Sequence, residues 1–411
     1  MRYRKAIVVG GSLGGLLAAN LLLRSGWDVH VYERAAQELE GRGAGIVTHP
    51  ELLDALESAG VAVDDAIGVK VLERVTLGKD GARIGSRAFP QILTAWAHMF
   101  DVLRSALPHE RYHNSKLLVS FAQDTQGVSA HFADGQTVAG DILIGADGVR
   151  SSLRQILLPS VTPLYAGYVA WRGLVEESLL SEAALGDVFP YFAFGLPPGE
   201  QMIAYPVAGS NNAVDVGHRR FNFVWYRPAD EATTLRDMVT DGRGKVWLDG
   251  IPPPLIRPEV LAHARQAAKD VLAPQFAEVV QKTENLFFQP IFDLESPQMA
   301  FGRIALLGDA AFVARPHCGM GVTKAAGDAV ALVHAIGENE SLAVALMAYE
   351  RTRIEFGRGI VEHGRKLGAY MQAQIRTPQE RQMAERYRTV HAVMSETAVP
   401  MSRGAGSRPQ H

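Results

Sequence analysis

The chain has 411 residues, of which 47% are apolar, and its 41 Lys and Arg against 44 Asp and Glu give a formal net charge of −3. This length predicts two domains, or one domain with a large insertion, and the near-balance of charge excludes the basic surface that nucleic acids or anionic membranes require. The single cysteine, Cys318, excludes an internal disulfide framework and a Cys-rich metal site, so we expect no bound metal and a cytoplasmic location.

Hydrophobic segments are short throughout the sequence. The first apolar run turns into glycines after AIVV at residues 6–9, which is too short for a signal-peptide core. No run approaches the roughly 18 to 20 apolar residues of a membrane span. We therefore expect small molecules, and neither membranes nor nucleic acids, as partners.

The first elements in chain order predict a β-α-β unit. Residues 6–9 are a β-branched run typical of a strand buried in a parallel sheet. Residues 13–25 (LGGLLAANLLLRS) are rich in Ala and Leu and stop at Gly26, as a helix with a glycine cap does. Residues 27–33 (WDVHVYE) alternate as a second strand that ends at Glu33.

Further buried strands are expected far along the chain. Residues 116–148 predict three short strands with turns at 124–127 and 134–135, and their last run, DILIGADG, has the composition of a buried strand. RIALLGDAA at 303–311 predicts another, followed by a helix over 321–337. Buried strands at three distant places predict one sheet assembled from separated segments.

The middle of the chain differs in composition. Residues 161–285 hold the aromatic runs YVAWRGLV, YFAFGL, QMIAYPVAG and FNFVWYR, separated by Pro and Gly. This pattern predicts an antiparallel sheet with an open face for a flat ligand. Residues 342–394 predict helices, and 395–411 lack periodicity, so we expect a mobile tail.

The glycine cluster after the first strand indicates a nucleotide. In VVGGSLGG, Gly10, Ser12 and Gly15 occupy the three glycine places of the dinucleotide fingerprint, with Ser12 as a departure. Glu33 lies at the end of the second strand, where a carboxylate accepts hydrogen bonds from a ribose hydroxyl. A tight turn without a ligand is the alternative, which the β-α-β context disfavours. A nucleotide diphosphate at the helix N-terminus is the favoured interpretation.

Two later motifs each place an aspartate beside glycine after a buried strand: GADGVRSSLR at 145–154 and GDAAFVARPHCGMG at 308–321. Asp147 and Asp309 have the acceptors that sugar or ribityl hydroxyls need. An ordinary turn is the alternative for each motif taken singly.

Together, in this order and spacing, the three motifs resemble the FAD-dependent aromatic hydroxylases of the para-hydroxybenzoate hydroxylase type, the group A flavoprotein monooxygenases. The segments GAGIVTHPELL, ERYHNSK, YAGYVAWRG and IAYPV resemble the hydroxypyridine hydroxylases of that family. The resemblance covers most of residues 5–350.

The resemblance implies an α/β fold, in which a Rossmann-like FAD-binding domain carries an inserted antiparallel-sheet substrate domain. The expected FAD-binding domain comprises residues 1–75, 99–160 and 286–345. The substrate domain comprises 76–98 and 161–285, and the C-terminal helices comprise 346–394. The resemblance further implies a homodimer.

Cofactor contacts also follow from the resemblance. Glu33 would bind the adenosine ribose, Asp147 would serve both FAD and the pyridine nucleotide, and Asp309 would bind the ribityl chain. Arg104 would contact the flavin phosphate or ribityl region, although this arginine is not universal among pyridine hydroxylases and a solvated helix residue is the alternative. The remaining expected FAD contacts are Gly10, Ser12, Leu13, Gly15, Arg34, Gly45, Gly321 and Val322.

In this family NAD(P)H reduces the flavin, O₂ adds at flavin C4a, and an electron-rich ring attacks the resulting hydroperoxide. The resemblance implies NADH as reductant and 2,6-dihydroxypyridine, converted to 2,3,6-trihydroxypyridine, as substrate. Another phenol or hydroxy-N-heterocycle, such as 6-hydroxynicotinate, is the alternative.

Such chemistry needs a dry pocket with a few hydrogen-bonding groups at the ring oxygens. Tyr205 and His317 are the expected catalytic residues, with a core tyrosine and a solvated loop histidine as the alternatives. The candidate pocket residues are Tyr191, Phe192, Phe194, Tyr205, Trp225, Tyr226, Pro316 and His317, and alternation lets about half of the strand residues face a ligand.

Three more residues have a chemistry-bearing side chain for which we favour a structural role. His49 precedes a helix and is expected to be structural or solvated. Arg172 is expected to pair with a carboxylate inside its domain. Cys318 adjoins His317, but flavin hydroxylation needs no protein nucleophile.

Two competing functions remain. A flavin halogenase or tailoring oxidase would share the fold, but the Trp-x-Trp-x-Ile-Pro signature is absent and VWLDGIP is a partial echo. A non-catalytic FAD-binding module has little need for an aromatic sheet. Substrate-stimulated NADH oxidation separates a hydroxylase from such a module.

Overall fold

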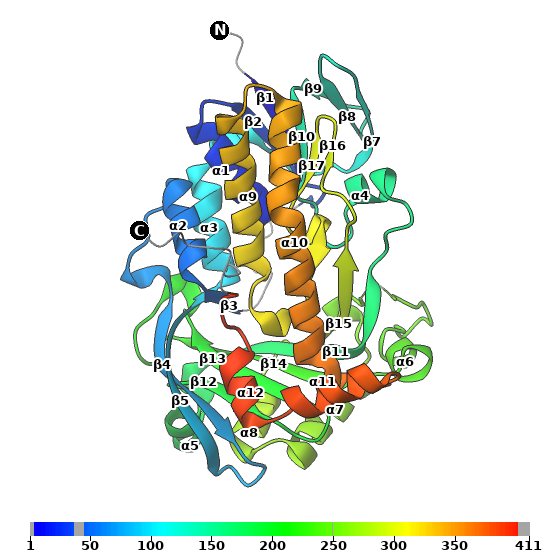
Figure 1. Ribbon diagram of the computed structural model, residues 1–411. Coiled ribbons are helices and arrows are strands. Elements are labelled where there is room, and N and C mark those ends of the chain that lie inside the picture. Colours follow the sequence, from blue (N-terminus) through cyan, green and yellow to red (C-terminus); the bar gives the residue numbers. More distant parts are fainter. Residues whose placement is uncertain (1–3, 37–44, 249, 402–411) are drawn as a thin grey trace, which may run out of the picture.

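The computed structural model describes residues 4–36, 45–248 and 250–401 of the chain. Within these residues, five parallel strands and an antiparallel edge strand form the sheet in the upper half of Figure 1. In spatial order they are β16 (Ala300–Phe301), β17 (Ile304–Leu306), β10 (Ile142–Gly145), β1 (Lys5–Val9), β2 (Asp28–Tyr32) and β6 (Tyr112–His113). The expected buried strands thus lie side by side, which confirms one sheet assembled from separated segments.

Helices cover one face of this parallel sheet (Figure 1). α1 packs against α9 and α3, α2 packs on α9, and α10 lies along α9. Their bounds are α1 (Leu13–Arg24), α2 (Pro50–Ser58), α3 (Trp96–Ala106), α9 (Gly321–Glu338) and α10 (Leu342–Gly368). The Ala and Leu side chains of α1 are almost all buried, because this helix lies between the sheet and its neighbours.

A small antiparallel sheet contacts the parallel sheet through β1 and β10. It consists of β7 (Leu118–Gln123), β8 (Val128–Phe132) and β9 (Thr137–Gly140). The two expected turns join these strands. The third expected strand, which follows the second turn, divides at Asp141 into β9 and the buried β10. The segment therefore holds four strands instead of three.

In the described part of the chain, nine strands form a second sheet, which crosses the lower half of Figure 1. β12 pairs with β4 in parallel and every other pairing is antiparallel. The spatial order is β18 (Phe312–Val313), β15 (Phe287–Glu295), β11 (Leu164–Glu176), β14 (Arg220–Pro228), β13 (Gln201–Val207), β12 (Phe192–Gly195), β4 (Val69–Leu77), β5 (Arg83–Ala95) and β3 (Gly45–Thr48).

The expected domain boundaries do not coincide with this sheet. The boundary at residue 75 falls inside β4, and β3 and β15 also pair here although their residues were expected in the FAD-binding domain. The strands of the large sheet extend past the boundaries because its hydrogen bonds join segments from both parts of the chain. The mixed α/β architecture itself agrees with the expected fold.

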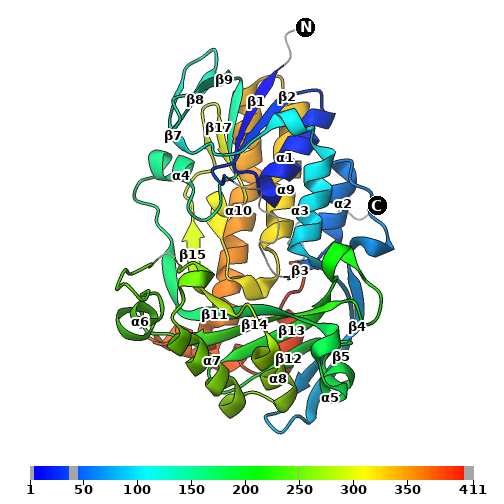
Figure 2. The same ribbon diagram turned by 180° about the vertical axis from the view of Figure 1, so that it is seen from behind.

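Helices pack on both faces of the nine-stranded sheet. The face turned away from the parallel sheet carries α5 (Glu182–Asp187), α7 (Pro258–Val271) and α8 (Pro274–Lys282), as Figure 2 shows from behind. The other face meets α10, α11 (Pro378–Tyr387) and α12 (Val390–Glu396). The short helices α4 (Ser152–Leu157) and α6 (Arg236–Met238) complete the set of described α-helices. None of the helices in the described residues is long and apolar enough to cross a membrane.

The C-terminal segment differs from its expectation. Of the tail expected to be mobile over 395–411, residues 402–411 lie outside the described residues. Residues up to 398 pack tightly: the buried guanidinium of Arg74 on β4 donates to the carbonyl oxygens of Met394, Thr397 and Ala398 at 2.9, 2.7 and 3.1 Å. The side chain of Arg74 therefore anchors this segment through hydrogen bonds to its backbone.

Candidate cofactor and substrate site

The loop between β1 and α1 excludes side chains at two of its glycines. Gly10 has a φ of +104°, and a Cβ there would meet the carbonyl oxygen of Ala146 at 2.4 Å. A Cβ on Gly15 would meet the carbonyl oxygen of Gly10 at 1.9 Å. These glycines let the helix, the loop and β10 approach closely, which is their role in a dinucleotide-binding turn.

Two helix N-termini meet beside this loop. Ser12, the N-cap of α1, makes no side-chain capping bond, and neither α1 nor α9 has an acidic residue in its first turn. A Cβ on Gly14 would lie 3.2 Å from the Cβ of Ala325, so the starts of α1 and α9 are in contact. Uncapped helix N-termini present backbone N–H groups and a positive dipole end, which suit phosphate.

The carboxylates expected to bind sugar hydroxyls lie around these N-termini. Glu33 is buried and accepts hydrogen bonds from the backbone N–H groups of Gly11 and Ala35 at 2.8 and 2.9 Å. Asp309 is half-exposed, with Lys324 Nζ 3.3 Å from its Oδ1. Each carboxylate oxygen can accept more than one hydrogen bond, so both groups retain capacity for hydroxyl donors.

Asp147 and Arg104 lie close to the same loop. The Oδ2 of Asp147 accepts from the backbone N–H of Ser152 at 2.7 Å, while its Oδ1 is buried without a hydrogen-bond partner in the described residues. Burial raises the pKa of Asp147 above its usual value, against the lowering effect of these hydrogen bonds. The guanidinium of Arg104 lies 4.6 Å from the ring centroid of Tyr112, whose hydroxyl donates to Gly11 O.

The other expected FAD contacts are distributed around this loop and on the second sheet. Leu13 is buried at the start of α1, Val322 is half-buried, and Arg34 and Gly321 are exposed. Gly45 begins β3 in the nine-stranded sheet. The bare glycine loop, the uncapped N-termini and the two carboxylates fit the diphosphate, ribose and ribityl groups of FAD. The contacts of individual residues stay predictions.

The aromatic residues of the large sheet divide between its two faces. Tyr205, Phe192, Phe194 and Tyr226 belong to the apolar cluster on the face that meets α10. Trp225 and Tyr191 lie on the opposite face, in the cluster with α7 and α8. Trp225 and Tyr191 were expected to line the same pocket as Tyr205, but they lie on the other face, because strand alternation points each away from its neighbour, Tyr226 or Phe192.

Tyr205 lies at the centre of the inner face. Its ring stacks on Phe192 with centroids 5.0 Å apart, and a Cβ on Gly45 would meet its Cε2 at 2.3 Å. Its hydroxyl has no hydrogen bond to any residue that the structure describes. Burial raises the pKa of Tyr205 to about 12, and the charge of Arg172 opposes this rise.

His317 is buried in the loop between β18 and α9. Its Nε2 lies 3.0 Å from the hydroxyl of Tyr168 on β11, and its ring packs edge-on against Tyr226. Burial, reinforced by the charge of Arg315, lowers its pKa well below the usual 6.5. The imidazole is thus neutral and enclosed, which contradicts the alternative of a solvated histidine. Pro316 beside it is exposed.

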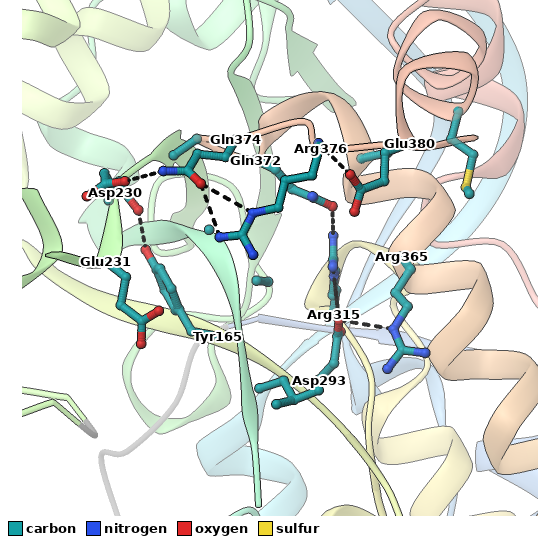
Figure 3. A pocket seen from close by; sticks show the side chains of 17 residues that line it. Tyr165, Asp230, Glu231, Asp293, Arg315, Arg365, Gln372, Gln374, Arg376 and Glu380 are labelled. Atoms are coloured by element: carbon teal, nitrogen blue, oxygen red, sulfur yellow. Dashed lines mark hydrogen bonds and ion pairs between the residues drawn. The ribbon is translucent and has the colours of Figure 1, made fainter. Parts of the chain in front are cut away.

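Arg315, two residues before His317, belongs to a network of charged and polar side chains (Figure 3). Arg315 donates to both oxygens of Asp293 on β15, at 2.9 to 3.2 Å, and to Gln372 Oε1 at 3.1 Å. Arg365 of α10 also contacts Asp293 at 3.2 Å. These groups are among the residues that line a cavity of about 420 Å³. A buried, bidentate arginine–carboxylate pair fixes the position of the loop and thereby of His317.

Two further residues join the loop to its surroundings, as expected of structural residues. His49 is buried, and its Nε2 lies 3.2 Å from the carbonyl oxygen of Gly319. Cys318 is buried with its Sγ 2.7 Å from the carbonyl oxygen of Arg315, and burial raises its thiol pKa to about 12. A thiol protonated at neutral pH is not a nucleophile. The backbone N–H of Ala398 donates to His317 O, which attaches the C-terminal segment to this loop.

Arg172 does not have its expected carboxylate partner. It is half-buried on β11, and its Nε is buried without a hydrogen bond within the described residues. The sequence interpretation also missed Tyr168 and Asn222, both of which lie on the inner face. The period-2 alternation of each strand could have indicated them, because Tyr168 shares a face of β11 with Arg172 and Asn222 shares a face of β14 with Tyr226. No group of residues that could hold a metal ion occurs in the described ranges.

Comparisons with known proteins agree with this site. Residues 3–79 match the family described as FAD binding domain, and residues 165–293 match the family described as FAD binding domain-like. The chain is 34% identical to 2,6-dihydroxypyridine 3-monooxygenase of Paenarthrobacter nicotinovorans over 89% of this chain and 91% of that protein. It is 30% identical to the FAD-dependent urate hydroxylase of Klebsiella pneumoniae over 88% and 89% of the two chains.

A solved structure is similar over nearly the whole fold. The 2,6-dihydroxypyridine-3-hydroxylase from Arthrobacter nicotinovorans superimposes with a TM-score of 0.85 and 32% sequence identity, covering 91% of this chain and 94% of that one. The similarity thus extends over more than nine-tenths of both chains.

Proposed function

Because the chain belongs to the FAD-dependent aromatic hydroxylases, the group A flavoprotein monooxygenases, we propose that its substrate is an electron-rich hydroxypyridine. The favoured reaction is conversion of 2,6-dihydroxypyridine to 2,3,6-trihydroxypyridine with NADH and O₂. The observation that carries this proposal is the enclosed aromatic face around Tyr205, whose hydroxyl is free to bond a ring oxygen. The similarity to 2,6-dihydroxypyridine 3-monooxygenase supports the choice of ring.

Each part of the site has a separate task in this proposal. When bound, FAD would supply the redox chemistry, with NADH as the electron donor and O₂ as the source of the oxygen atom. The starts of α1 and α9, with Glu33 and Asp309, hold the cofactor. Phe192 and Tyr226 exclude water from the ring, because their side chains are buried on the inner face.

Tyr205 and His317 are proposed to act on the substrate oxygen. The hydroxyl of Tyr205 orients the ring oxygen by a hydrogen bond, since its raised pKa keeps the phenol protonated. His317 stays neutral, so its Nδ1 is available for a hydrogen bond and not for uptake of a proton, and its Nε2 is linked to the sheet through Tyr168. Its enclosure makes Tyr205 the nearer candidate for direct substrate contact.

A product analysis tests the proposal. The FAD-loaded protein is incubated with NADH, ¹⁸O₂ and each of 2,6-dihydroxypyridine, 6-hydroxynicotinate, urate and 4-hydroxybenzoate, and products are identified by mass spectrometry. We expect one ¹⁸O atom in trihydroxypyridine and slower or no turnover of the others. Turnover of another ring in preference would reassign the substrate, with the urate arm motivated by the similarity to urate hydroxylase.

The proposal also includes the reductant, the oligomeric state and the cellular location. NADH as the preferred reductant and a homodimeric assembly rest on the family resemblance. A cytoplasmic location is supported by the single cysteine, whose thiol is buried. Comparison of NADH with NADPH in steady-state kinetics, and sedimentation analysis of the holoprotein, test the first two directly.

A further inference from the structure

Arg172 lies on the inner face of the nine-stranded sheet and has no anionic partner among the described residues. Its Nε is buried and makes no hydrogen bond, and no carboxylate of the described residues forms an ion pair with it. Two buried arginines elsewhere have acceptors. Arg315 pairs with Asp293, and Arg74 donates to backbone carbonyl oxygens. A partly desolvated guanidinium lacking such acceptors is suited to bind an external anion.

The register of the sheet defines the neighbours of Arg172. It lies opposite Val224 of β14, and Asn222 and Tyr226 flank Val224 on the same face. Tyr205 of β13 lies opposite Asn222. The four polar side chains therefore surround one patch of the face that carries Phe192. The charge of Arg172 acts on both phenols, because it lowers the pKa of Tyr205 and of Tyr226 against the larger effect of burial.

Asn222 supplies a second donor without a partner. The residue is fully buried, and its Oδ1 accepts a hydrogen bond from the backbone N–H of Gly45 at 3.0 Å. This bond fixes the amide so that Nδ2 is the remaining group, and Nδ2 has no acceptor in the described part of the chain. Buried amide donors are nearly always satisfied in folded proteins. Together with Arg172, this donor indicates a place for an acceptor that the described residues do not supply.

We propose that Arg172 binds an anionic oxygen of the aromatic substrate, with Asn222 as the neighbouring donor and Tyr205 against the ring. The inference rests on the proposed function and deepens it by assigning the residues that hold the substrate oxygen. For a hydroxypyridine, the ring O–H bond breaks, the electron pair stays on oxygen and the proton passes to bulk water as the ligand binds. Arg172 stabilises the oxyanion, which is also the more electron-rich form of the ring.

A ring oxyanion and a carboxylate could both bind to Arg172, and two probes distinguish them. The anion of 2,6-dihydroxypyridine carries its charge on a ring oxygen, whereas 6-hydroxynicotinate carries a carboxylate. The neutral 2,6-dimethoxypyridine cannot ionise at oxygen and serves as the uncharged counterpart. Tighter binding of the first probe assigns the subsite to a ring oxyanion, and tighter binding of the second assigns it to a carboxylate.

The test measures ligand binding to the FAD-loaded protein, by the change in the flavin absorption spectrum, for wild type, R172M, R172K and R83M. Arg83 is an exposed arginine on β5 and is the matched control for the loss of one positive charge. We expect R172M to raise the Kd of the anionic probe roughly 10- to 100-fold. R172K should recover part of this loss, R83M should match wild type, and the Kd of 2,6-dimethoxypyridine should not change.

The pH dependence provides a second readout that does not rely on a variant. In wild type the Kd of 2,6-dihydroxypyridine should decrease as the pH rises through the ligand's own pKa, and in R172M this dependence should be lost. Should R172M fail to fold, as judged by circular dichroism, the wild-type profile and R172K decide.

Three outcomes overturn the inference, and they differ from one another. Equal Kd values and equal pH profiles for wild type and R172M would exclude Arg172 from ligand binding while leaving the proposed function intact. Loss of FAD by R172M with unchanged ligand affinity would assign Arg172 to the cofactor. Failure of wild-type holoprotein to bind any of the aromatic probes would remove both the inference and the proposed function.

Discussion

The hydroxyl of Tyr168 lies 3.0 Å from Nε2 of His317, in a buried contact that joins β11 to the loop before α9. Burial raises the pKa of Tyr168 well above its usual value and lowers that of His317. Both groups are therefore neutral near pH 7, and the contact is a hydrogen bond between uncharged partners. It ties the aromatic sheet to the loop that follows Asp309.

Replacing His317 by Gln should change how stability depends on pH. In wild type the buried imidazole stays neutral below the usual pKa of 6.5, while the unfolded chain takes up a proton. The free energy of unfolding is therefore highest above this pH and falls as the pH decreases, by up to about 1.4 kcal/mol per pH unit for this group. H317Q should show a shallower decrease between about pH 6.5 and 5 in urea denaturation. The exposed His218 provides the control H218Q, and equal slopes for H317Q and wild type would contradict the account.

Gly10 should be essential for FAD binding for a reason beyond its backbone angle. G10A combines a positive φ with a Cβ 2.4 Å from Ala146 O, whereas a Cβ on Gly135, which also has a positive φ, would meet nothing within 4 Å. G135A should cost about 1 kcal/mol and keep its flavin. G10A should lose FAD, measured as the ratio of absorbance at 450 and 280 nm of the purified protein. Normal FAD content in G10A would show that the loop tolerates a side chain.

The two faces of the large sheet should respond differently to substitution. Y205F removes a hydroxyl on the inner face and should weaken binding of hydroxypyridine by about tenfold. W225F, on the opposite face, removes the donor that lies 2.8 Å from Glu200 Oε2 and should cost about 1 to 3 kcal/mol of unfolding free energy. Ligand affinity in W225F should equal that of wild type. A marked loss of ligand affinity in W225F with none in Y205F would reverse the assignment of faces.

Arg74 should anchor the C-terminal segment. R74M removes the Arg74 hydrogen bonds to the carbonyl oxygens of Met394 and Thr397, while Ala398 O keeps a hydrogen bond from Gln91 Nε2. We expect a loss of about 3 to 5 kcal/mol of unfolding free energy. Release of residues 394–398 should make the chain more susceptible to a protease within this segment. The rate of cleavage is measured by mass spectrometry of the fragments. R83M on the neighbouring strand β5, where Arg83 is exposed and makes its ring contact with Tyr191, is the control. A protease-resistant C-terminus in R74M would contradict the anchoring role.

Sequence patterns predicted the parts of the fold that depend on local order. The apolar run at residues 6–9, the glycines after it and the Ala/Leu helix each agree with their neighbours, so β1 and α1 were found with nearly correct bounds. The face of Trp225 was not predictable in the same way. Alternation places Trp225 and Tyr226 on opposite faces of the sheet. Only the pairing of β14 with its neighbours determines which of these faces is turned toward the parallel sheet.

Interactions between distant residues account for the remaining differences. The tail was expected to be mobile because residues 395–398 carry no periodic pattern, yet Arg74 holds them through backbone atoms that any sequence possesses. Arg172 was expected to pair with a carboxylate because buried charges usually do. The absence of a partner among the described residues depends on which side chains the sheet register brings together.

The central claim is that a bound flavin and the aromatic face around Tyr205 form one catalytic site. The most direct test is the rate of NADH oxidation by the yellow, FAD-loaded protein, with and without 2,6-dihydroxypyridine. The account predicts a slow rate alone, and a large acceleration by the ligand that is matched by hydroxylated product with little hydrogen peroxide. A protein that binds no FAD, or whose NADH oxidation is unaffected by every hydroxylated ring tested, would contradict it.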